Sequence, residues 1–506
     1  MGLKAALSKP FASLVVSGIK KWSAKPVETQ QKVFSELIAV AANTSFGKEH
    51  GFSKIKTYND YKKQVPVRDY EDFRKYIERI TAGEHDVLWK GLPIYFSKTS
   101  GTTSGTKYIP ITKESISNHI NSARNAILSY IHETGNSKFV DGKMIFLSGS
   151  PVLDMSKKIP TGRLSGIVNH HVPAYLRTNQ MPTYNTNCIE DWEKKVDAIV
   201  EETAKENMTL ISGIPPWVQM YFDKLIAKTG KPVKDIFPDF SLFIYGGVNF
   251  EPYRTKLEQS IGKKIDSIEL FPASEGFFAY QDLPAGRHGS QKENGLLLLL
   301  NEGIFYEFIP ASEYFNENPA RLSIADVELG VNYALVVSSN AGLWAYSIGD
   351  TIKFVSKNPY RVIVSGRIKH FTSAFGEHVI AEEVEAALKT ASEKYKAEVL
   401  EFTVAPQVTP TEGGLPYHEW FIACSKEPEN KEQFALLMDE TLQKKNVYYK
   451  DLIKGNILKP LVIRYLQPDA FVQYMKSQGK LGGQNKVPRL TNDRKIAEEL
   501  KKYIIK

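Results

Sequence analysis

The chain has 506 residues, more than one hydrophobic core usually holds, and its 42% hydrophobic and 24% charged content is that of a water-soluble globular protein. A net charge of +8, from 65 basic and 57 acidic residues without a dense basic block, does not indicate a nucleic-acid partner. The length predicts two or more domains. Cys188 and Cys424 lie far apart and lack metal-ligand spacing, so we expect a reducing, cytoplasmic compartment.

The N-terminal segment has apolar residues at helical spacing between residues 11 and 19, followed by Lys20 and Lys21. A signal peptide would carry a small-residue cleavage site there. The apolar run at residues 296–300 is closed by Asn301 and is too short to span a bilayer. We therefore predict no signal peptide, no membrane span and no membrane partner.

Helical and strand patterns alternate through the first two thirds of the chain. Helical spacing of apolar residues occurs at residues 34–41, 118–132, 192–204, 217–228 and 253–261. Short apolar runs typical of buried strands occur at residues 144–147, 208–211, 242–245, 268–271, 296–300, 305–309 and 334–337. This alternation predicts an α/β fold. The later strands follow one another without helices, which predicts a β-rich subdomain around residues 290–365.

The composition shifts at residues 364–368, which predicts a domain boundary there. We expect residues 1–366 to form a large N-terminal domain and residues 367–506 a small α+β C-terminal domain. Beyond the boundary, helices are predicted at residues 382–392 and 432–443 and strands at residues 399–404, 420–424 and 461–466. The glycine-rich stretch at residues 478–485 predicts a mobile loop directly before Lys486.

A hydroxyl-rich and glycine-rich loop lies between two strand-like segments at residues 94–96 and 108–109. Glycines let backbone N–H groups approach a ligand, and such N–H groups followed by a cation suit a polyphosphate. The spacing is not that of a Walker loop, because three residues separate its glycines and Thr106 precedes Lys107. The alternative is an ordinary surface loop. The candidate phosphate-binding residues are Thr99, Ser100, Gly101, Thr102, Thr103, Ser104, Gly105 and Lys107.

Two segments at predicted strand ends can add nucleotide contacts. Gly246 and Gly247 follow a strand, where a flat base can lie against backbone, although a tight turn is the more common meaning of such a pair. Glu275 also follows a strand, where a carboxylate can hold Mg²⁺ against phosphate oxygens. A solvated loop acid is the equally common alternative for Glu275.

Two later residues complete the candidate nucleotide site. Asp350 directly follows a glycine and is suited to accept both hydroxyls of a ribose, while an Asp in a hairpin turn is the common alternative. Lys486, on the glycine-rich loop of the last domain, is a candidate transition-state clamp, while a surface charge is the usual role. A hydrolase function has little support, because the sequence has no Gly-x-Ser-x-Gly motif of a serine hydrolase and no His-Glu-x-x-His motif of a metalloprotease.

In this order, the segments resemble the acyl-adenylate-forming superfamily. More closely, the chain resembles the Gretchen Hagen-type, auxin-responsive acyl-acid amido synthetases, as a bacterial-type member of that family. The matching segments are Thr44-Ser-Phe-Gly-Lys48, Gln64-Val-Pro-Val-Arg-Asp-Tyr-Glu-Asp72, Thr99-Ser-Gly-Thr-Thr-Ser-Gly105, Gly213-Ile-Pro-Pro-Trp217, Phe305-Tyr-Glu-Phe-Ile-Pro310, Ala341-Gly-Leu-Trp-Ala-Tyr-Ser-Ile-Gly-Asp350 and Phe375-Gly-Glu377.

The resemblance implies a large N-terminal domain and a C-terminal lid that close over ATP. It implies that residues 99–105 wrap the phosphates, that Ala273 and Ser274 lie near the nucleotide, and that Glu275 holds Mg²⁺. It also implies that Asp350 takes the ribose and that Arg367 sits at the hinge beside the nucleotide. Lys486 matches the lysine of the family's closing Gln-x-Lys-x-Pro-Arg segment. The chain departs from the family at Ser347, where an arginine is usual.

The implied reaction is ATP-dependent adenylation of a carboxylic acid, followed by acyl transfer to an amine, often an amino acid. The predicted acyl-binding residues are Val168, Tyr175, Ile214 and Trp217. The acid itself is not predictable, because an apolar wall discriminates by only about 1–3 kcal/mol per methylene. Two alternatives stay open, a ligase for coenzyme A or a carrier thiol, and a non-catalytic nucleotide- or acyl-binding protein. The oligomeric state is left open.

Overall fold

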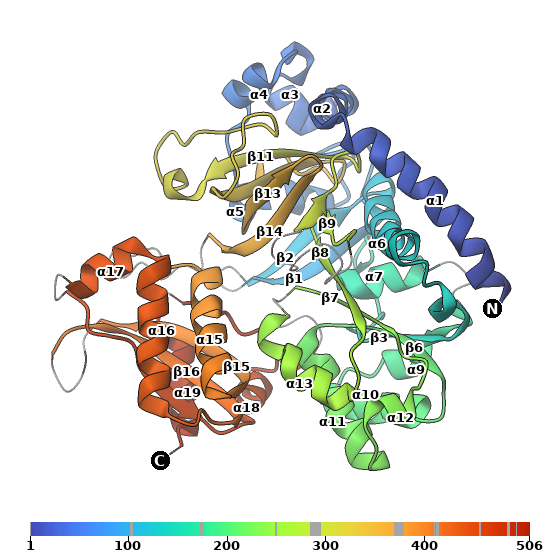
Figure 1. The fold of residues 1–506 in the computed structure, drawn as a ribbon. Helices are drawn as coiled ribbons and strands as arrows, with labels where there is room; N and C mark the ends of the chain where they lie inside the picture. Colours follow the sequence, from blue (N-terminus) through green and yellow to red (C-terminus); the bar gives the residue numbers. More distant parts are fainter. Residues whose placement is uncertain are drawn as a thin grey trace. The chain divides into compact units, whose positions relative to one another are not determined.

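The computed structural model describes residues 2–101, 105–172, 177–247, 250–283, 295–368, 379–408, 410, 414–454, 457–482, 486–491 and 493–505 (Figure 1). The chain divides into two compact units, one formed by Met1–Val248 with Gly262–Val364 and the other by Asn249–Ile261 with Ser365–Lys506. The second unit thus takes in helix α13 (Glu251–Ile261) from the middle of the chain. The two predicted domains are each continuous in sequence, so they place this helix in the N-terminal domain. Their boundary between residues 366 and 367 stays a prediction.

The first unit begins with helices that cover one part of its sheet. Their bounds are α1 (Leu3–Ser23), α2 (Pro26–Ala41), α3 (Ser45–Glu49), α4 (Tyr58–Gln64) and α5 (Tyr70–Thr81). Helix α5 begins at a capping box in which the Asp69 carboxylate accepts a backbone N–H and the Asp72 carboxylate accepts the Asp69 N–H. Within the described residues, no helix is both long and apolar enough to cross a membrane.

One long sheet forms the core of the first unit. In the described part of the chain its strand order is β11-β12-β13-β14-β10-β9-β8-β7-β6-β3-β5. Strands β5, β3, β6, β7 and β8 run parallel, and β9 reverses direction against β8. The strand bounds are β3 (Lys143–Phe146), β5 (Gln180–Met181), β6 (Met208–Ser212), β7 (Leu242–Gly246), β8 (Asp266–Ala273), β9 (Gly276–Tyr280), β10 (Leu296–Leu298), β11 (Ile304–Pro310), β12 (Asn332–Ser339), β13 (Tyr346–Lys357) and β14 (Tyr360–Arg367).

Helices connect the parallel strands, as the alternating pattern predicts. Their bounds are α6 (Lys113–Thr134), α7 (Leu164–His170), α9 (Tyr184–Asn187), α10 (Trp192–Thr203), α11 (Pro215–Thr229) and α12 (Val233–Ile236). Helix α6 packs on α1 and on β8 and β9, and its Ala126 and Ile131 share one buried cluster with Leu210 of β6. The predicted β-rich segment is present as β10 to β14, but it continues the main sheet instead of forming a sheet of its own.

A second, three-stranded sheet of the first unit has the order β2-β1-β4. Its strands are β1 (Tyr95–Gly101), β2 (Gly105–Ile111) and β4 (Thr161–Gly162). Strands β1 and β2 are antiparallel neighbours, and β4 pairs with β1 in parallel. The two predicted strands are thus confirmed as a β-hairpin, but most of the predicted loop is itself strand, because pairing continues to Gly101 and Gly105.

The second unit is the predicted α+β arrangement. Its sheet has the order β15-β16-β17, with β15 and β16 antiparallel and β16 and β17 parallel. The elements are α15 (Ala381–Tyr395), β15 (Glu398–Gln407), β16 (Tyr417–Lys426), α16 (Lys431–Lys445), α17 (Val447–Lys454), β17 (Val462–Leu466), α18 (Ala470–Ser477) and α19 (Lys495–Leu500). Helices α15 and α16 pack on each other, and their buried side chains form one apolar cluster with Phe402 and Trp420 of the sheet.

Candidate active site

The predicted phosphate loop joins the ends of β1 and β2. Gly101 lies opposite Gly105 in the hairpin, and Thr99 lies opposite Lys107. Thr102, Thr103 and Ser104 lie outside the described residues. The Lys107 ammonium lies 5.5 Å from the ring centroid of Tyr70. The described residues thus place Thr99 and Lys107 as partners at the base of the loop.

Helix α5 holds the second strand of this hairpin. The Tyr108 backbone N–H donates to the Tyr70 hydroxyl oxygen at 2.9 Å. Burial raises the pKa of Tyr70, so its hydroxyl stays neutral at physiological pH. Sequence analysis assigned no role to Tyr70, which lies within a segment quoted only for its family resemblance. The strand pattern gives no signal for it, because the contact joins segments far apart in the chain.

A hydrogen bond joins the phosphate hairpin to the turn that carries Ser274 and Glu275. The hydroxyls of Ser97, on β1, and Ser274 lie 2.8 Å apart. Ser97 is fully buried, and Ser274 is half-buried. Two segments about 177 residues apart in sequence therefore meet through one contact. Ser97 lies two residues before Thr99 and was not among the predicted site residues.

Ser274 and Glu275 form the two-residue turn of the β8–β9 hairpin, because Ala273 pairs with Gly276. Both turn residues are half-buried. Next to the turn, the buried Asn118 of α6 donates to the Phe277 carbonyl at 3.2 Å and accepts its N–H at 2.7 Å. The turn is thus held by backbone pairing on both strands and by a side chain from α6. A short turn so held presents Glu275 in a defined place.

The glycine pair lies at the carboxyl end of β7, beside β8. Gly246 pairs with Leu270, and a Cβ built on Gly246 would lie 2.6 Å from the Leu270 carbonyl oxygen. Gly247 has a φ of +80°, which L side chains rarely adopt. Both positions therefore require glycine. Close packing against β8 explains Gly246, and backbone conformation explains Gly247, so neither glycine by itself indicates a ligand. The pair does lie at the carboxyl end of a parallel strand, where nucleotides commonly bind in such sheets.

Asp350 lies in an irregular part of β13. On the neighbouring β12, Ala334 pairs with Thr351 and Val336 pairs with Ser347, so the residues between Ser347 and Thr351 form a bulge. Gly349 has a φ of +84° within it. Bulges re-aim side chains and are common beside active sites. The alternative of an Asp in a hairpin turn is wrong, because Asp350 lies within a long strand.

Ser347 stands where the family usually has arginine, and its surroundings show what it does. Its hydroxyl accepts a hydrogen bond from the Tyr314 hydroxyl at 2.7 Å, and its backbone N–H donates to the Arg68 carbonyl at 2.8 Å. Ser347 is only 6% exposed. This residue therefore braces the start of β13 from within the protein.

The predicted acyl-binding residues occupy different surroundings. Val168, on α7, packs against a small apolar cluster, and Ile214 is the half-buried residue before α11. Trp217 is 6% exposed, and its ring meets that of Trp192 edge to face at 5.1 Å. Its contacts are those of a core side chain. Tyr175 lies outside the described residues. An acyl-binding role for these four residues stays a prediction.

Next to Val168, His171 contacts the phosphate hairpin. Its Nε2 lies 3.2 Å from the hydroxyl oxygen of Tyr95, on β1, and the two rings meet edge to face. Burial lowers the pKa of His171, and neighbouring His170 and Arg177 lower it further, so the imidazole is neutral at physiological pH. The pair joins the residues after α7 to the strand that leads to Thr99.

In the second unit, Lys486 is exposed and directly precedes a segment that is anchored to β15. The Val404 N–H donates to the Arg489 carbonyl at 2.9 Å, and the Thr491 N–H donates to the Val404 carbonyl at 2.9 Å. The Thr403 hydroxyl also donates to the Pro488 carbonyl at 2.6 Å. The lysine is therefore carried at the end of a strand-like addition to the sheet.

The Arg489 side chain is a second anchor for this segment. Its guanidinium is 11% exposed, forms ion pairs with Glu401 and Glu385, and donates to the Tyr253 hydroxyl of α13. It also stacks over the Phe402 ring, with 4.6 Å between the guanidinium carbon and the ring centroid. Sequence analysis quoted this arginine only as part of the closing motif. Its role depends on acids that are distant in sequence.

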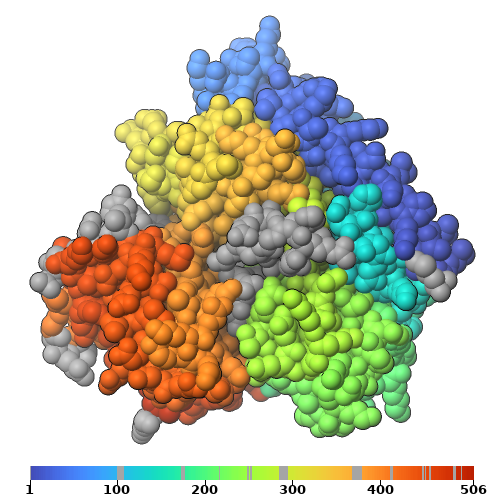
Figure 2. All heavy atoms as spheres, viewed as in Figure 1, coloured from blue at the N-terminus to red at the C-terminus, as the bar shows by residue number. Residues whose placement is uncertain are grey.

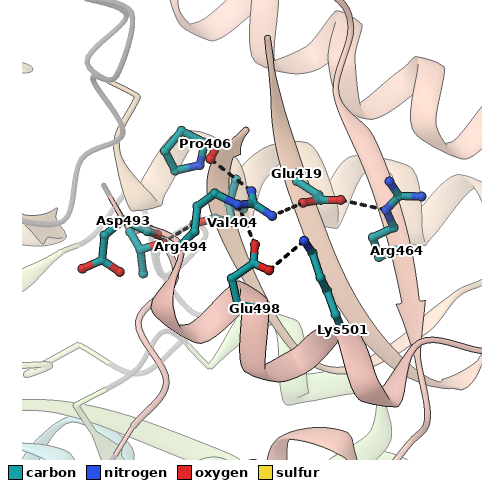
Figure 3. Close-up of polar contacts among 9 residues, drawn as sticks. Val404, Pro406, Glu419, Arg464, Asp493, Arg494, Glu498 and Lys501 are labelled. Carbon is teal, nitrogen blue, oxygen red and sulfur yellow. Dashed lines mark hydrogen bonds and ion pairs between the residues drawn. The ribbon is translucent and has the colours of Figure 1, made fainter. Parts of the chain in front are cut away.

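Beyond Arg489, a network of charged residues holds the end of the segment (Figure 3). Arg494 donates to Glu419 at 2.7 Å, to Glu498 at 2.9 Å and to the Pro406 carbonyl at 3.1 Å. The buried Glu419 carboxylate also accepts a hydrogen bond from Arg464 at 2.7 Å. Charge-assisted bonds of this kind are the strongest in proteins, so the segment is fixed on both sides of Leu490.

Comparison with protein families decides the assignment of the whole chain. Residues 15–181 match the GH3 family N-terminal domain, residues 297–366 the GH3 family central domain, and residues 382–495 the GH3 family C-terminal domain. The chain belongs to the GH3 family. The family predicted from sequence is thereby confirmed, whereas the bacterial type stays a prediction.

Two relatives of this GH3 protein align along 94% and 74% of its length. An indole-3-acetic acid-amido synthetase, GH3.3 of Arabidopsis thaliana, is 22% identical over 94% of this chain and 91% of its own. A jasmonoyl–L-amino acid synthetase, JAR4 of Nicotiana attenuata, is 22% identical over 74% of this chain and 75% of its own.

Solved structures confirm the predicted adenylate-forming fold. The acyl acid amido synthetase AtGH3.15 in complex with 2,4-DB superposes with a TM-score of 0.79 at 17% identity, over 98% of this chain and 96% of that one. A 2-hydroxyisobutyryl-CoA ligase in its postadenylation state superposes with a TM-score of 0.59 at 13% identity, over 94% and 90%. This GH3 protein therefore shares its fold with an acyl acid amido synthetase and with a CoA ligase.

Proposed function

We propose that this protein is an AMP-forming acyl acid amido synthetase, which adenylates a carboxylic acid with ATP and transfers the acyl group to an amino acid. The observation that carries the proposal is the match to all three GH3 family domains, in order, along one chain. Full-length similarity to amido synthetases of indole-3-acetic acid supports the reaction class. The acid used by this chain is a separate question.

The nucleotide site we propose lies in the first unit. The fit of ATP rests on two features, the position of Gly246 and Gly247 at the carboxyl end of the parallel strand β7 and the hairpin that ends in glycines on both strands. Residues 99–105 and Lys107 would bind the phosphates, and Ala273 and Ser274 would border the base. Asp350, in its bulge, would accept the ribose hydroxyls. Arg367, the last residue of β14, belongs to the second unit and stays the predicted hinge residue.

Glu275 is the residue we propose as a magnesium ligand. Among the described residues, no group of three or more His, Cys, Asp and Glu side chains could hold a metal ion by itself. A single carboxylate in a held turn fits Mg²⁺, which is commonly bound by one or two carboxylates together with substrate phosphates. When bound, Mg²⁺ neutralises charge on the phosphate oxygens.

In the first step, a carboxylate oxygen of the acid attacks the α-phosphorus of ATP, and the bond to the bridging oxygen of pyrophosphate breaks. Negative charge builds on the transferring group and on the departing pyrophosphate. N–H groups of the loop and the Lys486 ammonium would stabilise this charge, because preorganised donors act most strongly in a water-excluded site. The products are an acyl adenylate and pyrophosphate.

In the second step, the amine nitrogen attacks the acyl carbonyl carbon, loses a proton and displaces AMP. The new bond is an amide. Rotation of a C-terminal lid between the two steps would let one cleft serve both reactions. Val168, Tyr175, Ile214 and Trp217 are the residues we propose near the acyl group. His171 lies beside Val168 and Tyr95, so it is a further candidate for the residues that contact the acyl group.

The experiment that tests this function is pyrophosphate exchange with Mg²⁺ and a broad panel of carboxylic acids, followed by addition of mixed amino acids and thiols. We expect acid-dependent exchange, AMP as the nucleotide product and an amide detected by mass spectrometry. ADP as the product would exclude adenylation. A thioester in place of an amide would support the alternative of a coenzyme A or carrier-thiol ligase, which the shared fold with the 2-hydroxyisobutyryl-CoA ligase allows. Nucleotide binding without turnover of any acid would support the non-catalytic alternative.

A further inference from the structure

Helix α1 has two apolar faces, and only one of them is covered. Ala5, Ala12, Val16 and Ile19 are buried, and the helix packs along α6 (Figure 1). The exposed apolar residues of the helix are Leu3 (76% exposed), Leu7 (60%), Phe11 (43%) and Leu14 (71%). The helix lies at the surface in the space-filling view, in dark blue (Figure 2). None of these side chains belongs to the candidate active site.

The four exposed residues form one continuous stripe. They are spaced by four, four and three positions, so they lie above one another on a helix of 3.6 residues per turn. Single exposed apolar residues are normal on protein surfaces, whereas a contiguous row marks an interaction surface. The stripe lies opposite the buried face, because at 100° per residue its four positions fall on the other side of the helix from Ala5, Ala12, Val16 and Ile19.

The charged residues of this helix all have one sign, although only Lys21 lies in line with the stripe. From Gly2 to Val27 the chain has no acidic residue, whereas Lys9, Lys20, Lys21 and Lys25 are all exposed. Lys21 follows Leu14 by seven positions and therefore continues the same row. Acidic residues near the two ends of the helix already have partners. Asp141 accepts hydrogen bonds from the N–H groups of Gly2 and Ala5, and Glu28 forms an ion pair with Lys25 at 3.2 Å.

We propose that this face of α1 binds an anionic phospholipid surface. Leucine and phenylalanine side chains enter the boundary between head groups and acyl chains, while Lys21 at the end of the stripe and the positive charge of the whole helix favour anionic head groups. The expectation of no membrane partner rested on the absence of a spanning segment and a signal peptide. Peripheral binding needs neither.

Vesicle flotation tests the proposal on the full-length protein. The probes are vesicles of phosphatidylglycerol and phosphatidylcholine in equal parts, and vesicles of phosphatidylcholine alone. We expect binding to the anionic vesicles, weaker binding to the neutral ones, and loss of binding in about 0.5 M salt, where screening shortens the range of charge attraction. The variant Leu7→Glu/Leu14→Glu should bind at least about tenfold less, because it replaces apolar side chains by anions.

Two further variants make the test specific. Leu436→Glu places the same charge on another exposed leucine, 50% exposed on α16, and should bind like the wild type. Lys20→Ser/Lys21→Ser keeps the apolar stripe and should lose most of the dependence on anionic lipid. Thermal unfolding checks that each variant is folded, which we expect because every changed side chain is exposed.

Equal flotation of Leu7→Glu/Leu14→Glu and Leu436→Glu would overturn the proposal. The proposal would also be overturned if the wild type did not bind vesicles but formed a concentration-dependent dimer, measured by light scattering, and if Leu7→Glu/Leu14→Glu did not form this dimer. That result would assign the stripe to a second copy of the chain. Neither result depends on pyrophosphate exchange, so the outcome is independent of the proposed enzymatic function.

Discussion

The hydroxyl pair of Ser97 and Ser274 joins the phosphate hairpin to the turn that carries Glu275. Removing one hydroxyl leaves the other without this partner, at a cost of about 1–3 kcal/mol, whereas removing both costs less than the sum. We expect Ser97→Ala and Ser274→Ala each to lower stability and to raise the KM for ATP. A double-mutant cycle with urea unfolding and ATP kinetics measures the coupling. Additive effects in both measurements would show that the contact is not used.

Lys486 is the residue for which we predict the largest kinetic effect. Lys486→Ala should lower the adenylation rate by roughly 100-fold or more, the scale for loss of one preorganised donor. Affinity for ATP should change far less, because the interaction develops mainly in the transition state. Amide formation from a pre-made acyl adenylate should be less impaired, because pyrophosphate has already left.

Lys480 provides the matched control, because it is an exposed lysine only six positions earlier. Lys480→Ala should leave both half-reactions unchanged. The two half-reactions are measured separately in single turnovers. Lost ATP binding with normal adenylation by Lys486→Ala would assign Lys486 to ground-state binding and contradict the prediction.

At the scale of elements, the bulge in β13 depends on a backbone conformation that favours glycine. Gly349→Ala should cost about 1–2 kcal/mol of stability, because φ is +84° there. It should also raise the KM for ATP, because the strain displaces the adjacent Asp350. Gly330→Ala has a similar φ of +76° and open space around its Cβ, so it carries the same strain away from the site. An equal KM for ATP in the two variants would show that Asp350 takes no part in ATP binding.

The anchored segment of the second unit makes a different prediction. Arg489→Met leaves the carboxylates of Glu401 and Glu385 without their shared partner, and loss of a buried pair costs about 3–5 kcal/mol. Under conditions where the variant is folded, adenylation should slow with little change in the KM for ATP, because the segment that carries Lys486 is no longer anchored. Lys495→Met, at an 89% exposed lysine, should stay within about 0.5 kcal/mol of the wild type. Normal adenylation by folded Arg489→Met would show that the anchor is only structural.

For the whole molecule, the predicted hinge at Gly366 and Arg367 implies a lid of ordinary domain size. Limited proteolysis should cut within residues 365–370 or 478–486, and ATP together with a substrate acid should slow cutting. The Lys486→Ala protein, which we expect to bind ATP, should show the same protection. Equal cutting rates with and without ligands would count against a lid that closes.

Local patterns in the sequence predicted much of the fold because they report local physics. Apolar runs predicted β6, β7, β8 and β12, and helical spacing predicted α6 and α10 close to their bounds. The order of the motifs predicted the family, since each motif is a short, continuous stretch. These features depend on periodicity and on neighbours in the chain, so one sequence is enough to find them.

Tertiary structure alone decided how distant segments meet. The Ser97–Ser274 contact, the Asn118 bonds to Phe277 and the acids around Arg489 all join residues that no local pattern connects. Likewise, Asp350 was expected after a turn glycine, but pairing between β12 and β13 places it in a bulge. Strand register and burial are set by the whole core, because each depends on which strands become neighbours. The sequence by itself therefore determined the elements, the family and the candidate residues, and the tertiary structure decided which of those residues are held together and by what.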